Sequence, residues 1–162
     1  MKRMSQITGL TAVRSGTGRR IGCVERLCLS ADGQDALGLV LRLYGLTRKK
    51  RFVSFGSISL WGEVTVTVTR LEKIPAHLKG QEDASCLPVL DTSGGRLGWM
   101  TDAFIEEESG RVLAIEISRG YWDDLTTGRL RARDFTLRPD GVVAVTDDAG
   151  GVDESLPPAE SR

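Results

Sequence analysis

Two stretches of this chain carry the same pattern of apolar residues at a constant offset of 76 positions. Residues 19–41 lie over residues 95–117 in register, with Gly22 matching Gly98. Apolar positions that recur in this way indicate two copies of one supersecondary unit, because each copy must bury the same face. Since a chain of 162 residues has room for two small domains, we expect a tandem pair of one fold.

Within each copy the pattern is that of a strand, a tight turn and a second strand. In the first copy an Asp-Gly pair at 32–33 favours a hairpin turn, and the second copy has its turn at 108–111. Apolar residues then recur at every second position, namely Leu37, Leu39, Leu41 and Leu43 in the first copy and Leu113, Ile115 and Ile117 in the second. The run VTVTVT at 64–69 predicts a half-buried strand with its valines on one side.

About five short strands per copy are too few for a large sandwich and enough for a small barrel. The sequence therefore predicts an all-β chain with barrels at 1–70 and 86–147. The intervening residues 71–85 lack strand alternation and are predicted to form a linker with one helical turn after Pro75. Residues 148–162 are rich in Gly, Pro and acids, and they are predicted to be a disordered tail.

Composition argues against an enzyme and against a membrane-spanning protein. The chain has one histidine, His77, in the predicted linker, and its paired carboxylates at 106–108 and 123–124 are neighbours that point apart on a strand. No phosphate loop, dinucleotide fingerprint or Cys-x-x-Cys is present, so no catalytic residue, cofactor or metal is expected. The apolar runs are also shorter than the roughly 18 residues that cross a bilayer.

The three cysteines are an odd number, and the first residues lack the apolar stretch of a secretory signal. Cys23, Cys28 and Cys86 are therefore expected to be reduced thiols that are buried or half-buried, as is usual in the cytoplasm.

The net charge of zero conceals an asymmetry between the two halves. Residues 1–72 hold twelve Lys and Arg against five Asp and Glu, and residues 73–162 hold ten against seventeen. A basic half joined to an acidic half is consistent with self-association into a homo-oligomer, or with two surfaces that face different partners. Charges that only keep the protein in solution remain an equal alternative.

The phrase Gly-x-Gly-Arg-Arg-Ile-Gly-x-Val at 16–24, followed by a hairpin and a period-two strand, resembles the PRC-barrel domain family. That family is named after the H subunit of the photosynthetic reaction centre, and it includes the C-terminal domain of the ribosome-maturation factor RimM. Residues 7–13 and 52–58 resemble its first strand and the segment before its last strand. Residues 117–129 are similar to a loop in bacterial proteins that carry two such domains.

The resemblance implies a non-catalytic module that binds proteins or helps to assemble complexes. The alternative is a factor for ribosome or RNA maturation that makes non-specific contact through the basic first barrel. The separate N-terminal domain that accompanies the barrel in RimM has no counterpart here, which disfavours that alternative.

Two segments after matching strands are the candidate partner-binding sites. The first is the basic run Arg48, Lys49, Lys50 and Arg51, expected on a loop, where it could contact phosphates or an acidic protein face or simply be solvated. The second is the pair Tyr121 and Trp122, expected in a polar loop, either as an interface anchor or as a buried plug of the barrel. Trp61 is expected to fill the core or the space between the domains.

Overall fold

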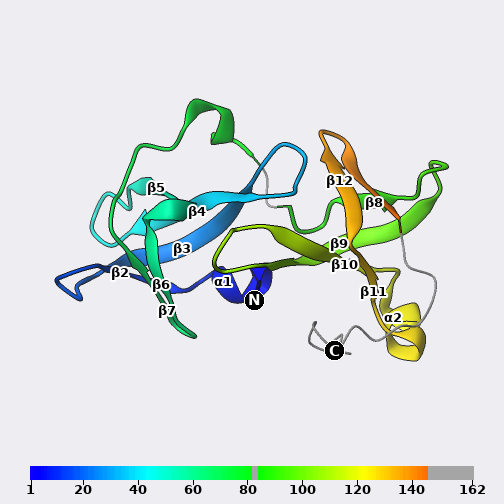
Figure 1. Ribbon diagram of the computed structural model, residues 1–162, viewed down its shortest axis with the longest axis horizontal. Helices are drawn as coiled ribbons and strands as arrows, with labels where there is room; N and C mark the ends of the chain where they lie inside the picture. The colour runs from blue at the N-terminus through cyan, green and yellow to red at the C-terminus, as the bar shows by residue number, and fades with distance from the viewer. Residues whose placement is uncertain (82–83, 146–162) are drawn as a thin grey trace.

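The computed structural model describes residues 1–81 and 84–145, and it contains two sheets that lie side by side along the long axis (Figure 1). The first sheet has the order β5-β4-β3-β2-β7-β6, and the second has the order β11-β10-β9-β8-β13-β12. In the first sheet the strands are β2 (Thr11–Arg14), β3 (Arg20–Leu29), β4 (Ala36–Leu43), β5 (Lys50–Ser54), β6 (Ile58–Trp61) and β7 (Thr65–Val68). In the second they are β8 (Pro88–Leu90), β9 (Arg96–Ile105), β10 (Val112–Ser118), β11 (Leu130–Ala132), β12 (Asp134–Arg138) and β13 (Gly141–Val145).

The two sheets therefore repeat one topology, strand for strand, as the 76-residue offset predicts. Both also place a parallel pair, β2 with β7 and β8 with β13, among otherwise antiparallel neighbours. The mostly β fold is thus confirmed. Each hydrogen-bonded order has two ends, at β5 and β6 or at β11 and β12, and no pairing joins these ends among the described residues. Closure into barrels is therefore not shown.

The matched glycines lie where two backbones approach closely. A Cβ atom on Gly22 would stand 2.4 Å from the carbonyl oxygen of Arg42, and one on Gly98 would stand 2.1 Å from that of Ser118. Arg42 and Ser118 are themselves 76 positions apart, so the same contact is built twice. Only glycine leaves room for such a contact.

The core-facing pattern of the central strands is mostly as predicted. Leu39, Leu41, Ile115 and Ile117 are fully buried. Leu113 does not continue the pattern and is 38% exposed, because the register shifts between Val112 and Ala114 and puts Val112 into the core in its place. In the first copy Ala36 takes the core position, and Leu37 packs into a separate cluster on the other face of the sheet.

The run at 64–69 also departs in part from its prediction. Val66 and Val68 are buried on β7, whereas Val64 precedes the strand and is 74% exposed. The period-two pattern therefore extends one residue beyond the strand at each end.

The N-terminal residues belong with the second sheet, although the sequence assigns them to the first domain. The short strand β1 (Lys2–Arg3) pairs with β9, and helix α1 (Met4–Ile7) follows it and packs between β9 and β3. Met4 and Ile7 are buried there. This crossover comes from tertiary packing, which a search for strand periodicity does not detect.

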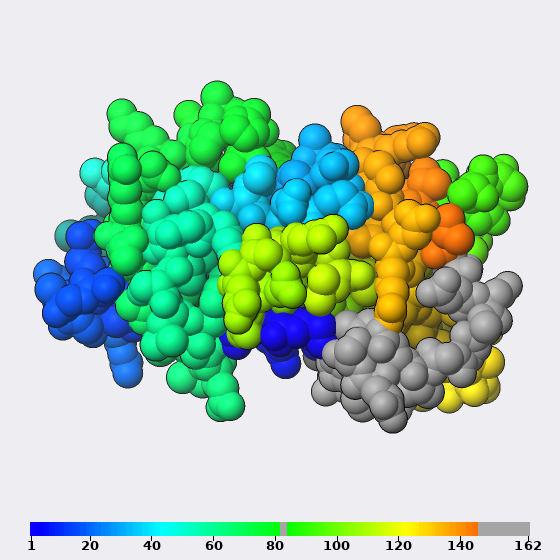
Figure 2. Space-filling view, viewed as in Figure 1, coloured from blue at the N-terminus to red at the C-terminus, as the bar shows by residue number. Residues whose placement is uncertain are grey.

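The two repeats meet through their equivalent hairpins. The backbone N–H of Ala36 donates to the carbonyl of Gly110 (2.7 Å), and that of Val112 donates to the carbonyl of Gln34 (2.8 Å). Each donor and each acceptor is 76 positions from its counterpart, so the junction has local two-fold symmetry. In Figure 2 the β9–β10 hairpin, in yellow-green, lies at the centre of the face between the two repeats.

A single apolar cluster runs through both repeats. It includes residues of both sheets, such as Leu39 and Ile115, and it also takes in α1. The repeats are therefore packed together rather than strung on a loose connection.

The linker lies against the first sheet. A short 3₁₀ turn, η2 (Ala76–Leu78), follows Pro75, as the sequence predicts. Leu78 is buried against Val40 and Phe52, and Glu72 exchanges two backbone hydrogen bonds with Phe52 on the edge strand β5. A second 3₁₀ turn, η1 (Phe55–Ser57), joins β5 to β6. The predicted disordered tail, residues 148–162, lies outside the described residues.

Among the residues that the structure describes, no helix is long and apolar enough to cross a membrane.

Candidate interaction surfaces

The two candidate segments occupy equivalent connections, as predicted. Residues 44–49 join β4 to β5, and residues 119–129 join β10 to β11. Because β4 and β10 hold the same place in their sheets, these connections leave their repeats at equivalent ends.

The basic run is only partly a loop. Arg48 and Lys49 are exposed in the connection, and Arg48 has a φ of +41° at the turn. Lys50 and Arg51 are instead the first two residues of β5, so the prediction of a four-residue basic loop is wrong for them. Alternation along β5 separates their side chains: Lys50 pairs across from Arg42, and its ammonium group lies 2.8 Å from the Glu25 carboxylate.

Tyr121 and Trp122 open a short helix, α2 (Tyr121–Thr127), where the sequence predicts a loop. Their side chains are 69% and 77% exposed, and their rings make an edge-to-face contact at 5.4 Å. The alternative of a buried plug is therefore wrong. This helix presents two large aromatic side chains to solvent as a paired surface.

Asp124 anchors α2 to the sheet. Its carboxylate accepts hydrogen bonds from the Ser118 hydroxyl (2.6 Å) and from the Arg119 backbone N–H (3.1 Å), and it lies 3.4 Å from the Arg129 guanidinium. Gly128, at a φ of +75°, ends the helix. The helix that carries the aromatic pair is therefore fixed to the second sheet.

Behind α2 lies a buried ionic network that sequence reasoning missed. Glu116 is fully buried, and it accepts hydrogen bonds from Arg3 (2.6 Å) and Arg129 (2.8 Å). Arg3 also lies 3.4 Å from Asp102, which is 4% exposed and accepts two hydrogen bonds from Ser5. The network ties the N-terminal segment to β9, β10 and the chain after α2.

Two arginines around the network have shifted pKa values. The hydrogen bond and charge of Glu116 raise the pKa of Arg129 above its ordinary value, while burial lowers that of Arg131. The guanidinium groups of Arg3 and Arg131 both lie about 5 Å from the ring centre of Phe104, at 5.1 and 5.0 Å. From the sequence, a glutamate between apolar residues of a period-two strand is expected to face solvent. The one sign that Glu116 is buried is that it matches the apolar Val40 of the first copy.

Trp61 is half-buried and packs against the shared core, as predicted. Its ring lies 5.9 Å from that of Phe55, and Phe55 in turn lies against Gly110 of the second repeat. Trp61 therefore contributes to the packing between the two repeats and belongs to neither candidate surface.

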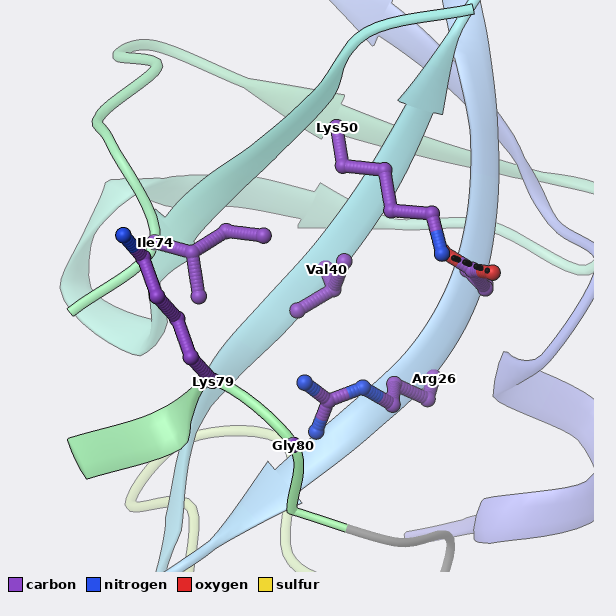
Figure 3. A pocket seen from close by; sticks show the side chains of 7 residues that line it. Arg26, Val40, Lys50, Ile74, Lys79 and Gly80 are labelled. Carbon is purple, nitrogen blue, oxygen red and sulfur yellow. Dashed lines mark hydrogen bonds and ion pairs between the residues drawn. The ribbon is translucent and has the colours of Figure 1, made fainter. Parts of the chain in front are cut away.

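Two cavities open on the outer face of the first sheet, the face that carries Arg26, Val40 and Phe52. One, of about 380 Å³, is lined by Glu25, Arg26, Val40, Lys50, Ile74, Lys79 and Gly80 (Figure 3). The other, of about 450 Å³, is lined by Cys23, Arg42, Leu43, Tyr44, Gly45 and Arg48. Both are rich in cationic side chains, so this face favours anionic groups.

The cysteines differ in environment. Cys28 is buried, and desolvation raises the pKa of its thiol against the opposing charge of Arg26. Cys23 is half-buried, but Cys86 is exposed, which corrects the expectation that all three would be at least half-buried. No group of three or more His, Cys, Asp or Glu side chains suited to a metal ion occurs in the described part of the chain.

No protein-family model matches this chain, and a search of curated proteins finds no match. The resemblance to PRC-barrel domains therefore remains a proposal.

Proposed function

We propose that this chain is a non-catalytic adaptor, built from two PRC-barrel-like domains, that binds a protein partner and helps to assemble a larger complex. The observation that carries the proposal is the exposed pair of Tyr121 and Trp122 on α2. Exposed aromatic side chains on a held element are the residues most often found to dominate binding energy at protein interfaces.

The geometry around α2 favours an anchor over an incidental surface residue. Asp124 holds the helix by three contacts, so little conformational entropy is lost when a partner covers the aromatic rings. Leu125 is 45% exposed on the same helix and adds apolar area beside the rings. A partner with a shallow apolar pocket is the expected occupant.

The basic run has a different role in this proposal. Arg48 and Lys49 are exposed at the equivalent end of the first repeat. Solvated charges contribute little to affinity but raise the rate of encounter with an acidic partner, and salt screens that effect. We therefore propose that Arg48 and Lys49 raise the association rate, and that Tyr121 and Trp122 lower the dissociation rate.

The experiment is an affinity capture with the full chain, with and without nuclease, followed by calorimetry with each partner that is identified. Trp122→Ala should weaken binding by about 30-fold or more at any salt concentration. Leu60→Ala is the matched control, because Leu60 is 64% exposed on the edge strand β6 of the other sheet. It should bind like the wild type.

Two outcomes would contradict the proposal. Equal affinity of folded Trp122→Ala and wild-type protein would place the interface elsewhere. Loss of every captured partner after nuclease treatment would favour the RNA or ribosome alternative, with the cationic outer face of the first sheet as the contact surface.

A further inference from the structure

The 380 Å³ cavity on the first sheet has a counterpart in the second repeat that is filled. The pairing of β3 with β4 matches that of β9 with β10 position by position, so Arg26 corresponds to Asp102 and Val40 to Glu116. In the second repeat the guanidinium of Arg3 occupies this place and contacts both carboxylates, at 3.4 and 2.6 Å. At the same site in the first repeat, no residue that the structure describes takes the place of Arg3.

The reason lies in the segments that precede the two repeats. Gly9 donates its backbone N–H to Val24, and Cys86 donates its own to Met100, in equivalent bonds of 2.9 and 2.7 Å. Each preceding segment crosses to the face of the other repeat. Counting back six residues from each donor gives Arg3 in one segment and Gly80 in the other.

Glycine leaves the space open. Gly80 lines the cavity, and a Cβ atom built on it would meet no atom within 4 Å. Figure 3 shows Arg26 reaching from β3 toward Gly80, with Ile74 and Lys79 on the linker side. The cavity therefore has room for one side chain, and none of the described residues fills it.

The charge of the site is reversed relative to its counterpart. Lys50 pairs with Glu25 at 2.8 Å, which leaves Arg26 and Lys79 without a carboxylate among the described residues. The Arg26 guanidinium is held by a hydrogen bond to the carbonyl of Leu78 (2.9 Å), so its position is fixed in advance. The second repeat places a cation between two acids, whereas the first repeat offers the fixed Arg26 guanidinium to an acid, with a further cation on the linker.

We propose that this cavity binds the carboxylate side chain of an acidic peptide segment. Val40 and Ile74 supply an apolar wall for the methylene groups, and the Arg26 guanidinium receives the carboxylate. The Lys79 side chain points away from Arg26 in Figure 3 and adds a positive charge at the linker side of the cavity. The preference of the cavity for a carboxylate stands on this geometry alone. That the carboxylate belongs to a protein partner rests on the proposed function.

The first test introduces the carboxylate by substitution at Gly80, so that the protein supplies its own ligand. Gly80→Glu, Gly80→Gln and Gly80→Arg share the cost of a side chain at a φ of +78°, so differences among them report charge. We expect Gly80→Glu to melt about 3 °C above Gly80→Gln, with Gly80→Arg the lowest of the three. A Gly80→Glu protein that melts at or below Gly80→Gln would overturn the proposal, whatever happens at α2.

The second test uses an added ligand. The wild-type protein is titrated with the capped peptide Gly-Glu-Gly-Glu-Gly, with its glutamine counterpart and with inorganic phosphate, while the backbone amide signals of Arg26 and Gly80 are followed by NMR. Only the glutamate peptide should shift both signals at low salt, and Gly80→Glu should lose the response at least tenfold because its own carboxylate fills the site. Equal responses to both peptides, or a stronger response to phosphate, would contradict the assignment to an acidic side chain.

Discussion

Among the residues that the structure describes, Glu116 is the acidic side chain with the lowest exposure to solvent. A carboxylate removed wholly from water is stable only when its charge is compensated and its oxygens are hydrogen-bonded. Arg3 and Arg129 each supply one such bond, to different oxygens. This one side chain therefore links the start of the chain to the segment that carries α2.

Replacing Glu116 by Gln should lower the free energy of unfolding by about 3 kcal/mol, because two partly buried guanidinium groups lose the buried carboxylate that they share. Urea titration followed by circular dichroism measures this. Glu107→Gln is the matched control, since Glu107 lies in a partly exposed pair with Lys2 at 3.7 Å and should change stability by less than about 0.5 kcal/mol. Equal losses in the two variants would show that the buried network is not a major source of stability.

Gly98→Ala should destabilise the protein by more than about 3 kcal/mol, because its new methyl group would overlap the Ser118 carbonyl oxygen. Gly94→Ala separates this overlap from backbone strain. Gly94 has a φ of +89° and open space around it, so only the strain of about 1–2 kcal/mol applies. If both variants unfold at the same urea concentration, close approach is not the reason for glycine at 98.

At the scale of elements, the hairpins and central strands could be predicted from the sequence, and α2 could not. Alternating apolar residues identify strands such as β4 directly, since one face must be buried. Helix α2 has only seven residues, too few for a 3.6-residue period to be visible, and its hold on the sheet comes from Asp124 and Arg129. The sequence predicts a loop for the whole basic run because its four adjacent charges give no sign that the edge strand β5 begins at Lys50.

The core strands of the two repeats should contribute equally to the free energy of unfolding. Leu39→Ala and Ile115→Ala should each cost about 2–5 kcal/mol, because both side chains are fully buried at matching positions. Thermal and urea unfolding measure the loss. A loss below about 1 kcal/mol at either site would mean that the matching strand does not face the core.

The β3–β4 turn should confer a pH-dependent part of the stability. Hydrogen bonds from the Ser30 hydroxyl and the Gln34 backbone N–H lower the pKa of Asp32 below its ordinary value of 3.8. A lowered pKa in the folded state stabilises the protein above pH 3.8, and this stabilisation is lost as the pH falls through the lower, folded value. Asp32→Ala should thus melt below the wild type at pH 7, and the difference should vanish in strong acid. A difference that persists there would assign it to the turn geometry instead.

At the scale of the whole molecule, the duplication could be predicted but the way the copies join could not. The 76-residue offset of apolar positions predicts two similar units. The crossing of β1 to β9, and the hydrogen bonds between Ala36 and Gly110 and between Val112 and Gln34, depend on surfaces that exist only after the sheets have formed. Because one apolar cluster runs through both repeats, we expect a single cooperative unfolding transition.

We propose that this duplicated framework presents α2 to a protein partner. Hydrogen–deuterium exchange of the full chain, alone and with a captured partner, tests it most directly. We predict that the partner slows exchange in residues 119–129, with a smaller effect in residues 44–49. Slowed exchange confined to other strands, with α2 exchanging as fast as in the isolated protein, would contradict the claim.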